Sequence, residues 1–408
     1  MQVPFCKRRL PCASSVTEAG SSTPKLGGRL RFADIRLVIG TRPEAIKLAP
    51  VAHALAARGL RPSLIFTGQH SSLDPAEHRL ERFDAVRLDC PGRANPDDHV
   101  GCVTATVTAE LRKRPDLLVV QGDTSSALGG ALAGFMSGIP VAHVEAGLRT
   151  HDPRLPWPEE RYRTAIDAAA DLLFAPTEQA SKNLQMEKVT GAIHVTGNTA
   201  IDALLEVVDR LPRAPQRVAE SRRMLVTCHR RESWGDGLRS IAAAVRDLAA
   251  DGLAAIDLIL PPNEHVAATM SKLLSAVPNV TLRDPCSHPE LIQRMREADV
   301  VLSDSGGMQE EAPALGVPLL VLREKSERPE GIASGNMRLI GTSTEAIVAE
   351  ARRLLSDPLA YAAMSRPAFP YGDGKAGPRI AAIIETWLQM PDRAVAPVSR
   401  GSVPAWRS

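Results

Sequence analysis

Apolar and polar positions alternate along this chain in a pattern that is typical of strands and helices following one another. Short apolar runs such as "IRLVIG", "DLLVVQGD" and "PVAHVEAG" predict buried strands. Segments between them, such as "TRPEAIKLAPVAHALAARG" and "SALGGALAGFMSG", have helical spacing and end at a glycine. Strands that alternate with helices favour a doubly wound parallel sheet.

The pattern restarts beyond Thr199. Further strands are predicted at "RMLVTC", "IDLILP", "ADVVLSD" and "PLLVLRE", with the helix "GLRSIAAAVRDLAADG" after the first. The sequence therefore predicts an α/β protein with two domains in tandem, over residues 35–199 and 200–365. Because such sheets bind ligands beyond the carboxyl ends of their strands, we expect the functional site in the cleft between the domains.

Composition narrows the possible functions. The net charge is +2 and no basic stripe stands out, which argues against a nucleic-acid partner. No apolar run is long enough to span a bilayer. The six cysteines form no C-x-x-C pair, so they indicate neither a zinc site nor a disulfide framework, and free thiols fit a reducing cytosol. Residues 1–34 lack the apolar core of a signal peptide, and we expect disorder there and in the proline-rich residues 391–408.

Three acids follow predicted strands of the first domain. Asp123 and Glu145 come directly after two strands, and Glu159 lies in "PWPEERYR", whose two prolines predict a rigid loop. Several carboxylates at one cleft indicate acid–base chemistry or metal binding. Metal binding is the weaker interpretation, because the acids lack the spacing of a calcium loop and nearby Arg and Lys suit a bare diphosphate.

Glycines and cations indicate a phosphate site. Ser305, Gly306 and Gly307 follow a strand and open a helix, whose free N–H groups can bind phosphate, although a plain helix cap has the same sequence. Glu311 lies farther along this helix. Its spacing favours a position on the solvated face of the helix over a role as a carboxylate that binds ribose. Arg42, Lys47 and His229 also follow strands. The two cations suit a diphosphate, although helix-surface Arg and Lys are commoner, and a histidine at a strand exit is functional more often than average.

The motifs together resemble those of the non-hydrolysing UDP-N-acetylglucosamine 2-epimerases over roughly residues 35–385. In family order, the matching segments are "GTRPEAIKLAP", "TGQH", "GDTSSAL", "HVEAGLRT", "PWPEE", "VTGN", "CHRRES", "DSGGMQEEAPALG", "ERPEG" and "PYGDG". The resemblance implies two Rossmann-like domains in a glycosyltransferase-B arrangement. It also implies a C-terminal helix within residues 366–390 that crosses back to the first domain, a homodimer and a cytoplasmic location.

The resemblance implies a reversible reaction at C2 of UDP-N-acetylglucosamine that yields UDP-N-acetylmannosamine through elimination of UDP, a glycal intermediate and re-addition. No metal, nicotinamide or other cofactor is implied. Asp123, Glu145 and Glu159 correspond to the catalytic acids, and His229 to the group that steadies the diphosphate and assists its departure. The implied substrate-binding residues are Arg42, Lys47, Ser305, Gly306, Gly307, Glu311 and Arg328.

Two alternatives share this fold. One is a hydrolysing 2-epimerase that releases N-acetylmannosamine and UDP, and the other is a UDP-sugar-binding protein without epimerase activity. The chain also departs from the family pattern: Tyr162 stands in place of an asparagine, Ser71 and Ser72 replace longer polar residues, and a histidine is missing or moved to His265. These changes lie near a regulatory UDP-N-acetylglucosamine site of bacterial members, so we expect little activation by this ligand.

Overall fold

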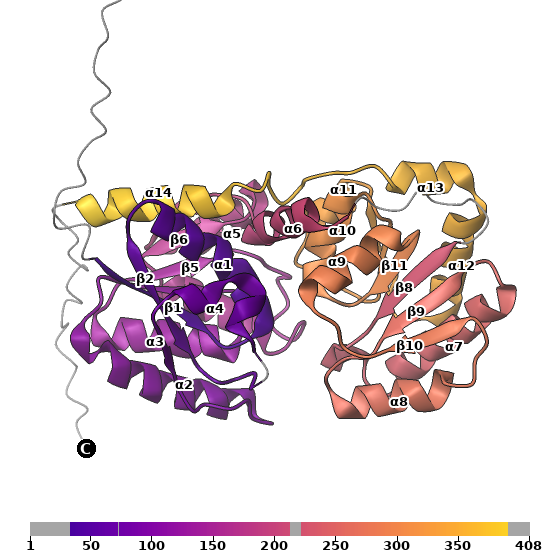
Figure 1. Ribbon diagram of the computed structural model, residues 1–408, viewed down its shortest axis with the longest axis horizontal. Helices are drawn as coiled ribbons and strands as arrows, with labels where there is room; N and C mark the ends of the chain where they lie inside the picture. Colours follow the sequence, from indigo (N-terminus) through magenta and orange to yellow (C-terminus); the bar gives the residue numbers. More distant parts are fainter. Residues whose placement is uncertain (1–32, 72, 213–221, 391–408) are drawn as a thin grey trace, which may run out of the picture.

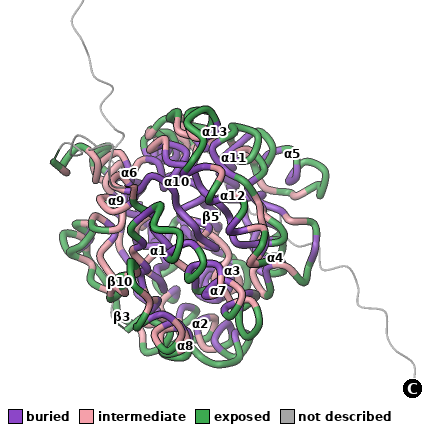
Figure 2. The backbone as a smooth tube through the Cα atoms, turned by 90° about the vertical axis from the view of Figure 1, so that its right-hand side faces the viewer, coloured by how far each residue is buried: buried purple, intermediate pink, exposed green. Residues whose placement is uncertain are grey.

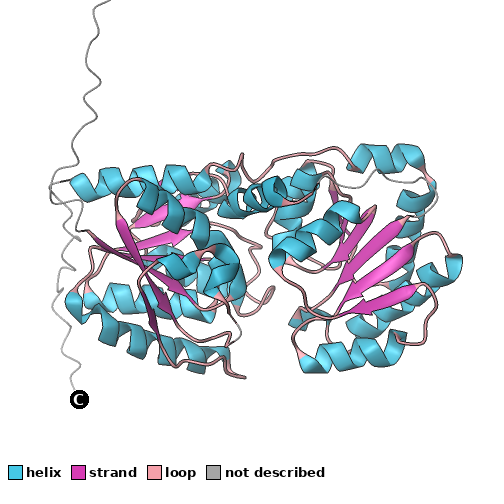
Figure 3. Ribbon diagram, viewed as in Figure 1, coloured by secondary structure: helices cyan, strands magenta, loops and turns pink. Residues whose placement is uncertain are grey.

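Two parallel sheets, each covered by helices, make up the described chain (Figures 1 and 3). The structure is a computed structural model that describes residues 33–71, 73–212 and 222–390. The expected disordered tail over residues 391–408, and the expected N-terminal extension except its last two residues, lie outside these ranges. Ser72 lies outside them as well.

The first sheet has seven strands in the order β3-β2-β1-β4-β5-β6-β7, all parallel. Its strands are β1 (Asp34–Ile39), β2 (Arg61–Phe66), β3 (Ala85–Arg87), β4 (Leu117–Gln121), β5 (Val141–Val144), β6 (Leu172–Ala175) and β7 (Ala192–Val195). Its helices are α1 (Arg42–Ala57), α2 (Pro96–Glu110), α3 (Ser125–Ser137), α4 (Glu159–Ala169) and α5 (Glu178–Glu187), with single 3₁₀ turns at Pro75–His78, Leu80–Arg82 and Leu111–Lys113.

The second sheet has six parallel strands in the order β10-β9-β8-β11-β12-β13. Its strands are β8 (Arg223–Thr227), β9 (Ala255–Ile259), β10 (Val280–Arg283), β11 (Val300–Ser303), β12 (Leu319–Val321) and β13 (Met337–Leu339). Its helices are α7 (Asp236–Asp251), α8 (Glu264–Leu274), α9 (His288–Glu297), α10 (Gly306–Leu315), α11 (Pro329–Ala333), α12 (Thr344–Ser356) and α13 (Pro358–Met364), with a 3₁₀ turn at Arg231–Ser233.

Each sheet has an apolar core on both faces. In the first domain, one core packs the sheet against α1 and the last helix, and the other packs it against α2, α3, α4 and α5. The second sheet lies between α7, α8 and α12 on one face and α9 and α10 on the other. A strand that is buried on both faces has a continuous run of apolar residues in its sequence. The sequence pattern therefore predicted these buried strands (Figure 2).

Strand order identifies both halves as Rossmann-like. In each sheet the order starts 3-2-1-4-5-6 when the strands are numbered within their own half, which is the doubly wound order with a switch point beside the first strand. Two such domains that face each other form the predicted glycosyltransferase-B arrangement. The predicted fold class is confirmed.

Two helices connect the halves. The last helix, α14 (Ala376–Gln389), packs against α1 of the first domain although α13 lies on the second (Figure 1). The helix α6 (Thr199–Arg210) contacts α1 and α14 as well as α9 and α10. Because α6 belongs to both halves, the domain boundaries given above stay a prediction. No helix among the described residues is long and apolar enough to cross a bilayer.

Candidate active site

A cavity of about 680 Å³ lies between the two domains, at the ends of the central strands of both sheets. Its lining includes residues that follow β1, β4 and β5 in the first domain and β8 and β11 in the second. All predicted site residues except Arg42 and Glu311 line this cavity. Their convergence follows from topology, because the carboxyl ends of parallel strands meet at one edge of each sheet.

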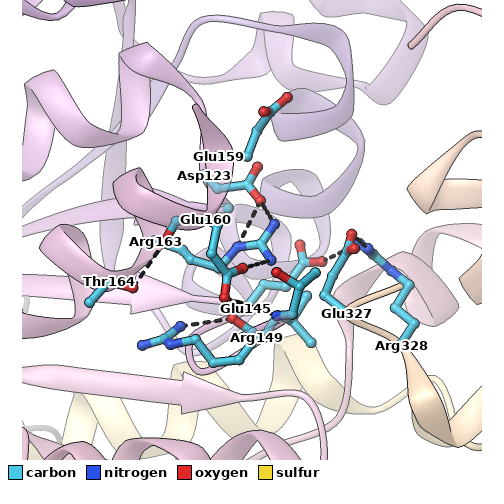
Figure 4. A network of polar contacts seen from close by, with 12 residues as sticks. Asp123, Glu145, Arg149, Glu159, Glu160, Arg163, Thr164, Glu327 and Arg328 are labelled. Carbon is cyan, nitrogen blue, oxygen red and sulfur yellow. Dashed lines mark hydrogen bonds and ion pairs between the residues drawn. The ribbon is translucent and has the colours of Figure 1, made fainter. Parts of the chain in front are cut away.

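Asp123 is held by a buried guanidinium. Arg163, on α4, donates from Nε to Oδ2 of Asp123 at 3.1 Å, and from Nη1 to Oε2 of Glu160 at 2.9 Å. Figure 4 shows Arg163 between these two carboxylates. Burial alone would raise the pKa of Asp123, but the Arg163 charge outweighs it and holds this pKa below its usual value. Asp123 is therefore ionised at neutral pH.

Glu159 is the first residue of α4, so the prediction of a rigid loop is wrong for this residue and for Glu160. The prolines come immediately before the helix, where they are compatible with its first turn. Nη1 of Arg230 donates to Oε1 of Glu159 at 3.3 Å across the domain interface. Burial raises the pKa of Glu159, while Arg230 opposes the shift.

Glu145 has an unusual backbone conformation. Its φ angle is 72°, in the left-handed region that costs free energy for a residue with a side chain. The N–H groups of Glu145 and Ala146 both donate to the carbonyl of Phe174, at 3.0 and 3.1 Å, which fixes this turn. Its carboxylate accepts from Nζ of Lys47 at 2.7 and 2.8 Å. Burial, and then the charge of Glu310, raise the pKa of Glu145.

His229 is oriented by Asp304. The two lie at the ends of the neighbouring strands β8 and β11, with Nδ1 of His229 3.2 Å from Oδ1 of Asp304. The same carboxylate accepts the backbone N–H groups of His229 and Arg230 at 2.9 Å. Burial would raise the pKa of Asp304, but the hydrogen bond from His229 outweighs it, so this pKa lies below its usual value. The Asp304 carboxylate therefore fixes the position of the His229 ring at the cavity.

The start of α10 forms the expected polar cradle. Ser305 is the N-cap of this helix and makes no capping hydrogen bond with its side chain, and it lines the cavity together with Gly306 and Gly307. A Cβ atom on Gly306 would lie 3.1 Å from the guanidinium of Arg328, so glycine lets Arg328 approach the helix end. This places backbone N–H groups and a cation side by side, as a phosphate site requires.

Arg42 and Glu311 lie beside the cavity and do not line it. Nη1 of Arg42 donates to the carbonyl of Cys286 at 2.8 Å, across the domain interface. Glu311 is buried and hydrogen-bonded to Nε2 of His288 at 2.7 Å, so the solvated helix face favoured by its spacing is wrong. Among the described residues, Nη2 of Arg42 and Nδ1 of His288 are buried without a hydrogen-bond partner.

Sequence reasoning missed several charged residues of the site. Arg163 and Glu327 line the cavity, and Glu327 contacts the guanidinium of Arg328 (Figure 4). The three-residue spacing of Glu160 and Arg163 on α4 was the available signal for Arg163. Tyr162, one of the departures from the family pattern, lines the cavity and donates to Oδ1 of Asp97 at 2.7 Å.

The arrangement suits proton transfer next to a bound anion. Three carboxylates with different environments, of which Glu145 is buried, can take or give protons, and cations and N–H groups can stabilise a leaving diphosphate. His265, the other departure named above, lies on α8 with its ring 5.9 Å from that of Trp234, and does not line the cavity. In the described part of the chain, no group of three or more His, Cys, Asp or Glu side chains is placed to hold a metal ion.

Comparison with known proteins gives a consistent result. The family model described as UDP-N-acetylglucosamine 2-epimerase matches residues 53–385. A probable UDP-N-acetylglucosamine 2-epimerase of Ralstonia nicotianae is 41% identical over 375 residues, covering 87% of this chain and 99% of the relative. The UDP-N-acetylglucosamine 2-epimerase of Escherichia coli K12 is 40% identical, covering 84% of this chain and 96% of the relative.

A solved structure has the same fold. UDP-GlcNAc 2-epimerase from Neisseria meningitidis, bound to UDP-GlcNAc, superposes with a TM-score of 0.82 and 34% sequence identity, covering 86% of this chain and 100% of that one.

Proposed function

The chain belongs to the UDP-N-acetylglucosamine 2-epimerase family, and we propose that it interconverts UDP-N-acetylglucosamine and UDP-N-acetylmannosamine without hydrolysing them. The observation that carries this proposal is the convergence of Asp123, Glu145 and Glu159 with paired cations in one interdomain cavity. A buried carboxylate can remove the weakly acidic proton at C2 only when it is held close to it.

The proposed reaction proceeds by elimination and re-addition. A carboxylate takes the proton from C2, the C–H electron pair forms the C1–C2 double bond, and the C1–O bond breaks to release UDP. A proton then returns to C2 on the opposite face of the glycal, and the UDP oxygen adds to C1. Asp123 follows β4, Glu145 follows β5 and Glu159 lies on α4. These carboxylates supply acid and base groups around the sugar ring.

The leaving diphosphate needs positive charge that is already in place. The N–H groups at the start of α10 and the ring of His229, held by Asp304, face the same cavity. The adjoining pair of Glu311 and His288, together with Arg42, supplies hydrogen-bonding groups for the nucleoside. Lys47 lines the cavity, but its ammonium group contacts Glu145 and Glu310, so we assign it to these carboxylates as well as to the substrate.

The proposed chemistry uses no metal or cofactor, because proton transfer and departure of UDP can be carried by side chains. We also propose that the protein acts in the cytoplasm, where UDP-sugars are made, and that it is a homodimer. Size-exclusion chromatography with light scattering measures the assembly: a mass near twice 43.7 kDa is expected, and a mass near 43.7 kDa would contradict the dimer.

Product analysis tests the proposed function. The purified protein is incubated with UDP-N-acetylglucosamine and followed by ³¹P and ¹H NMR. The expected result is a stable mixture of the two UDP-sugars that is also reached from pure UDP-N-acetylmannosamine. Stoichiometric accumulation of free N-acetylmannosamine and UDP would show a hydrolysing enzyme instead. Binding of the UDP-sugar with no new product would show a binding protein.

A further inference from the structure

Glu310 lies next to the proposed site but cannot reach its ligand. Its side chain has an exposed fraction of 0%, and it is not among the residues that line the cavity. Lys47, Glu145 and Arg328, all of which do line the cavity, surround it. A fully buried carboxylate is costly unless it is paired, so its position among these groups calls for a physical explanation.

The four side chains form one buried cluster that spans the domain interface. Lys47 and Glu145 belong to the first domain, and Glu310 and Arg328 to the second. Nζ of Lys47 lies 2.7 Å from Glu145 and 2.9 Å from Glu310. Nη2 of Arg328 lies 3.2 Å from Glu145 and 2.7 Å from Glu310. Lys47 and Arg328 are thus shared between Glu145 and Glu310, and Arg328 also pairs with Glu327 through Nη1.

The sharing is unequal. Arg328 donates from both Nε and Nη2 to Oε1 of Glu310, at 2.8 and 2.7 Å, but reaches Glu145 only through Nη2. Glu310 therefore takes the larger part of the guanidinium charge. The other groups that face Glu145 are Lys47 from α1 and the neutral amide of Gln121 from β4, which donates to Oε2 of Glu145.

We propose that Glu310 is a positioning residue for Glu145, which it keeps basic by occupying the cations that would otherwise neutralise the Glu145 carboxylate. The proposal rests on the proposed function, in which Glu145 is one of the proton-transfer groups. A base that is fully neutralised by two cations would be too weak to remove a proton from C2, whereas a base without any cation would be protonated in a buried site. By taking part of the cationic charge, Glu310 keeps the basicity of Glu145 between these two extremes.

The sign of the effect follows from the charges. With Glu310 ionised, burial and the Glu310 charge raise the pKa of Glu145. Glu310→Gln leaves Lys47 and the Nη2 group of Arg328 to Glu145, so the pKa of Glu145 falls by about one unit or more. The basic form of Glu145 then persists to lower pH, and the acidic limb of the pH profile of kcat/KM moves down by the same amount. The rate on the plateau falls severalfold, because a weaker base transfers the proton more slowly.

The experiment compares Glu310→Gln, Glu310→Asp and a matched control. Glu310→Asp keeps the charge and is expected to restore the position of the acidic limb, which a purely structural role would not do. The control is Glu385→Gln. It removes a largely buried carboxylate that pairs with Arg58, the C-cap of α1, and neither residue lines the cavity. The acidic limb of the pH profile of this control should lie at the same pH as in the unsubstituted protein. Thermal melting verifies that each variant is folded.

A second measurement does not depend on turnover. Infrared difference spectra between low and high pH show carboxyl groups that lose their proton, and the band missing in Glu145→Gln belongs to Glu145. This band should titrate at lower pH in Glu310→Gln than in the unsubstituted protein. An unchanged titration, or an unchanged acidic limb with only KM or stability altered, overturns the proposal. Absence of epimerisation in the unsubstituted protein would refute the proposed function alone, because the infrared result would still decide the effect of Glu310 on Glu145.

Discussion

At the residue scale, each of the three proposed catalytic acids pairs with a cation. Asp123 pairs with Arg163, Glu159 with Arg230, and Glu145 shares Lys47 with Glu310. The environments push the pKa values apart: that of Asp123 lies below its usual value, whereas those of Glu145 and Glu159 lie above it. Acids with separated pKa values can act as proton donor and acceptor at the same pH.

The first prediction concerns these acids. Asp123→Asn, Glu145→Gln and Glu159→Gln should each fold and bind UDP, because each change keeps the shape of the side chain. Each should lower kcat by about 10²–10⁴-fold, the usual effect of removing a general acid or base. Steady-state kinetics with UDP titrations by calorimetry measure both quantities. A variant that keeps full turnover would remove its residue from the proposed mechanism.

At the element scale, a close contact joins α14 to the first domain. A Cβ atom on Gly377, in the first turn of α14, would lie 2.8 Å from the carbonyl oxygen of Pro50 on α1. The carboxylate of Asp202 on α6 accepts the N–H groups of Ala376 and Gly377, at 3.1 and 2.8 Å. The start of α14 is therefore fixed by two other helices, and the backbone of α1 leaves no room for a side chain there.

The second prediction tests this junction with a matched pair of glycine substitutions. Gly377→Ala should destabilise the protein by about 1–3 kcal/mol, because backbone must move to admit the methyl group. Gly101→Ala, at an exposed position of α2 with open space around it, should stabilise by about 0.5–1 kcal/mol. Urea unfolding measures both changes. Equal effects of the two substitutions would contradict the close contact of α14 with α1.

The sequence predicted the elements well because their residues are locally consistent. Continuous apolar runs located the strands, and strand exits located Asp123, Glu145 and His229, since parallel topology brings such positions together. Glu311 could not be assigned from its own helix, because its partner His288 comes from α9. Arg163 was missed for a similar reason: its partner Asp123 lies 40 residues earlier in the chain. Only the packing of α4 brings the two together.

At the scale of the whole molecule, ion pairs across the interface hold the two domains together. Nζ of Lys325, in the second domain, lies 2.8 Å from Oδ2 of Asp152 in the first. Lys325 is 47% exposed, so the contact contributes at most about 1 kcal/mol. Together with the pair of Arg230 and Glu159 inside the cavity, it favours the closed arrangement in which the acids face the second domain. Closure of this kind would shield the glycal of the proposed reaction from water.

The third prediction follows from this contact. Lys325→Ala should lower kcat/KM by up to about fivefold, the equivalent of 1 kcal/mol, and should increase the radius of gyration of the ligand-free protein in X-ray scattering. Lys272→Ala, which removes an exposed lysine of α8 away from the cavity, serves as the control. If Lys325→Ala matches the control in both measurements, the ion pair does not contribute to closure.

Exchange of the C2 hydrogen with solvent tests the central claim most directly. The protein is incubated with UDP-N-acetylglucosamine in deuterium oxide, and both UDP-sugars are isolated and examined by mass spectrometry and ¹H NMR. Removal of the C2 proton by a carboxylate, followed by its return from exchangeable groups, predicts one deuterium at C2 in UDP-N-acetylmannosamine and, at equilibrium, in UDP-N-acetylglucosamine as well. Formation of UDP-N-acetylmannosamine that retains its original C2 hydrogen would contradict the proposed acid–base mechanism.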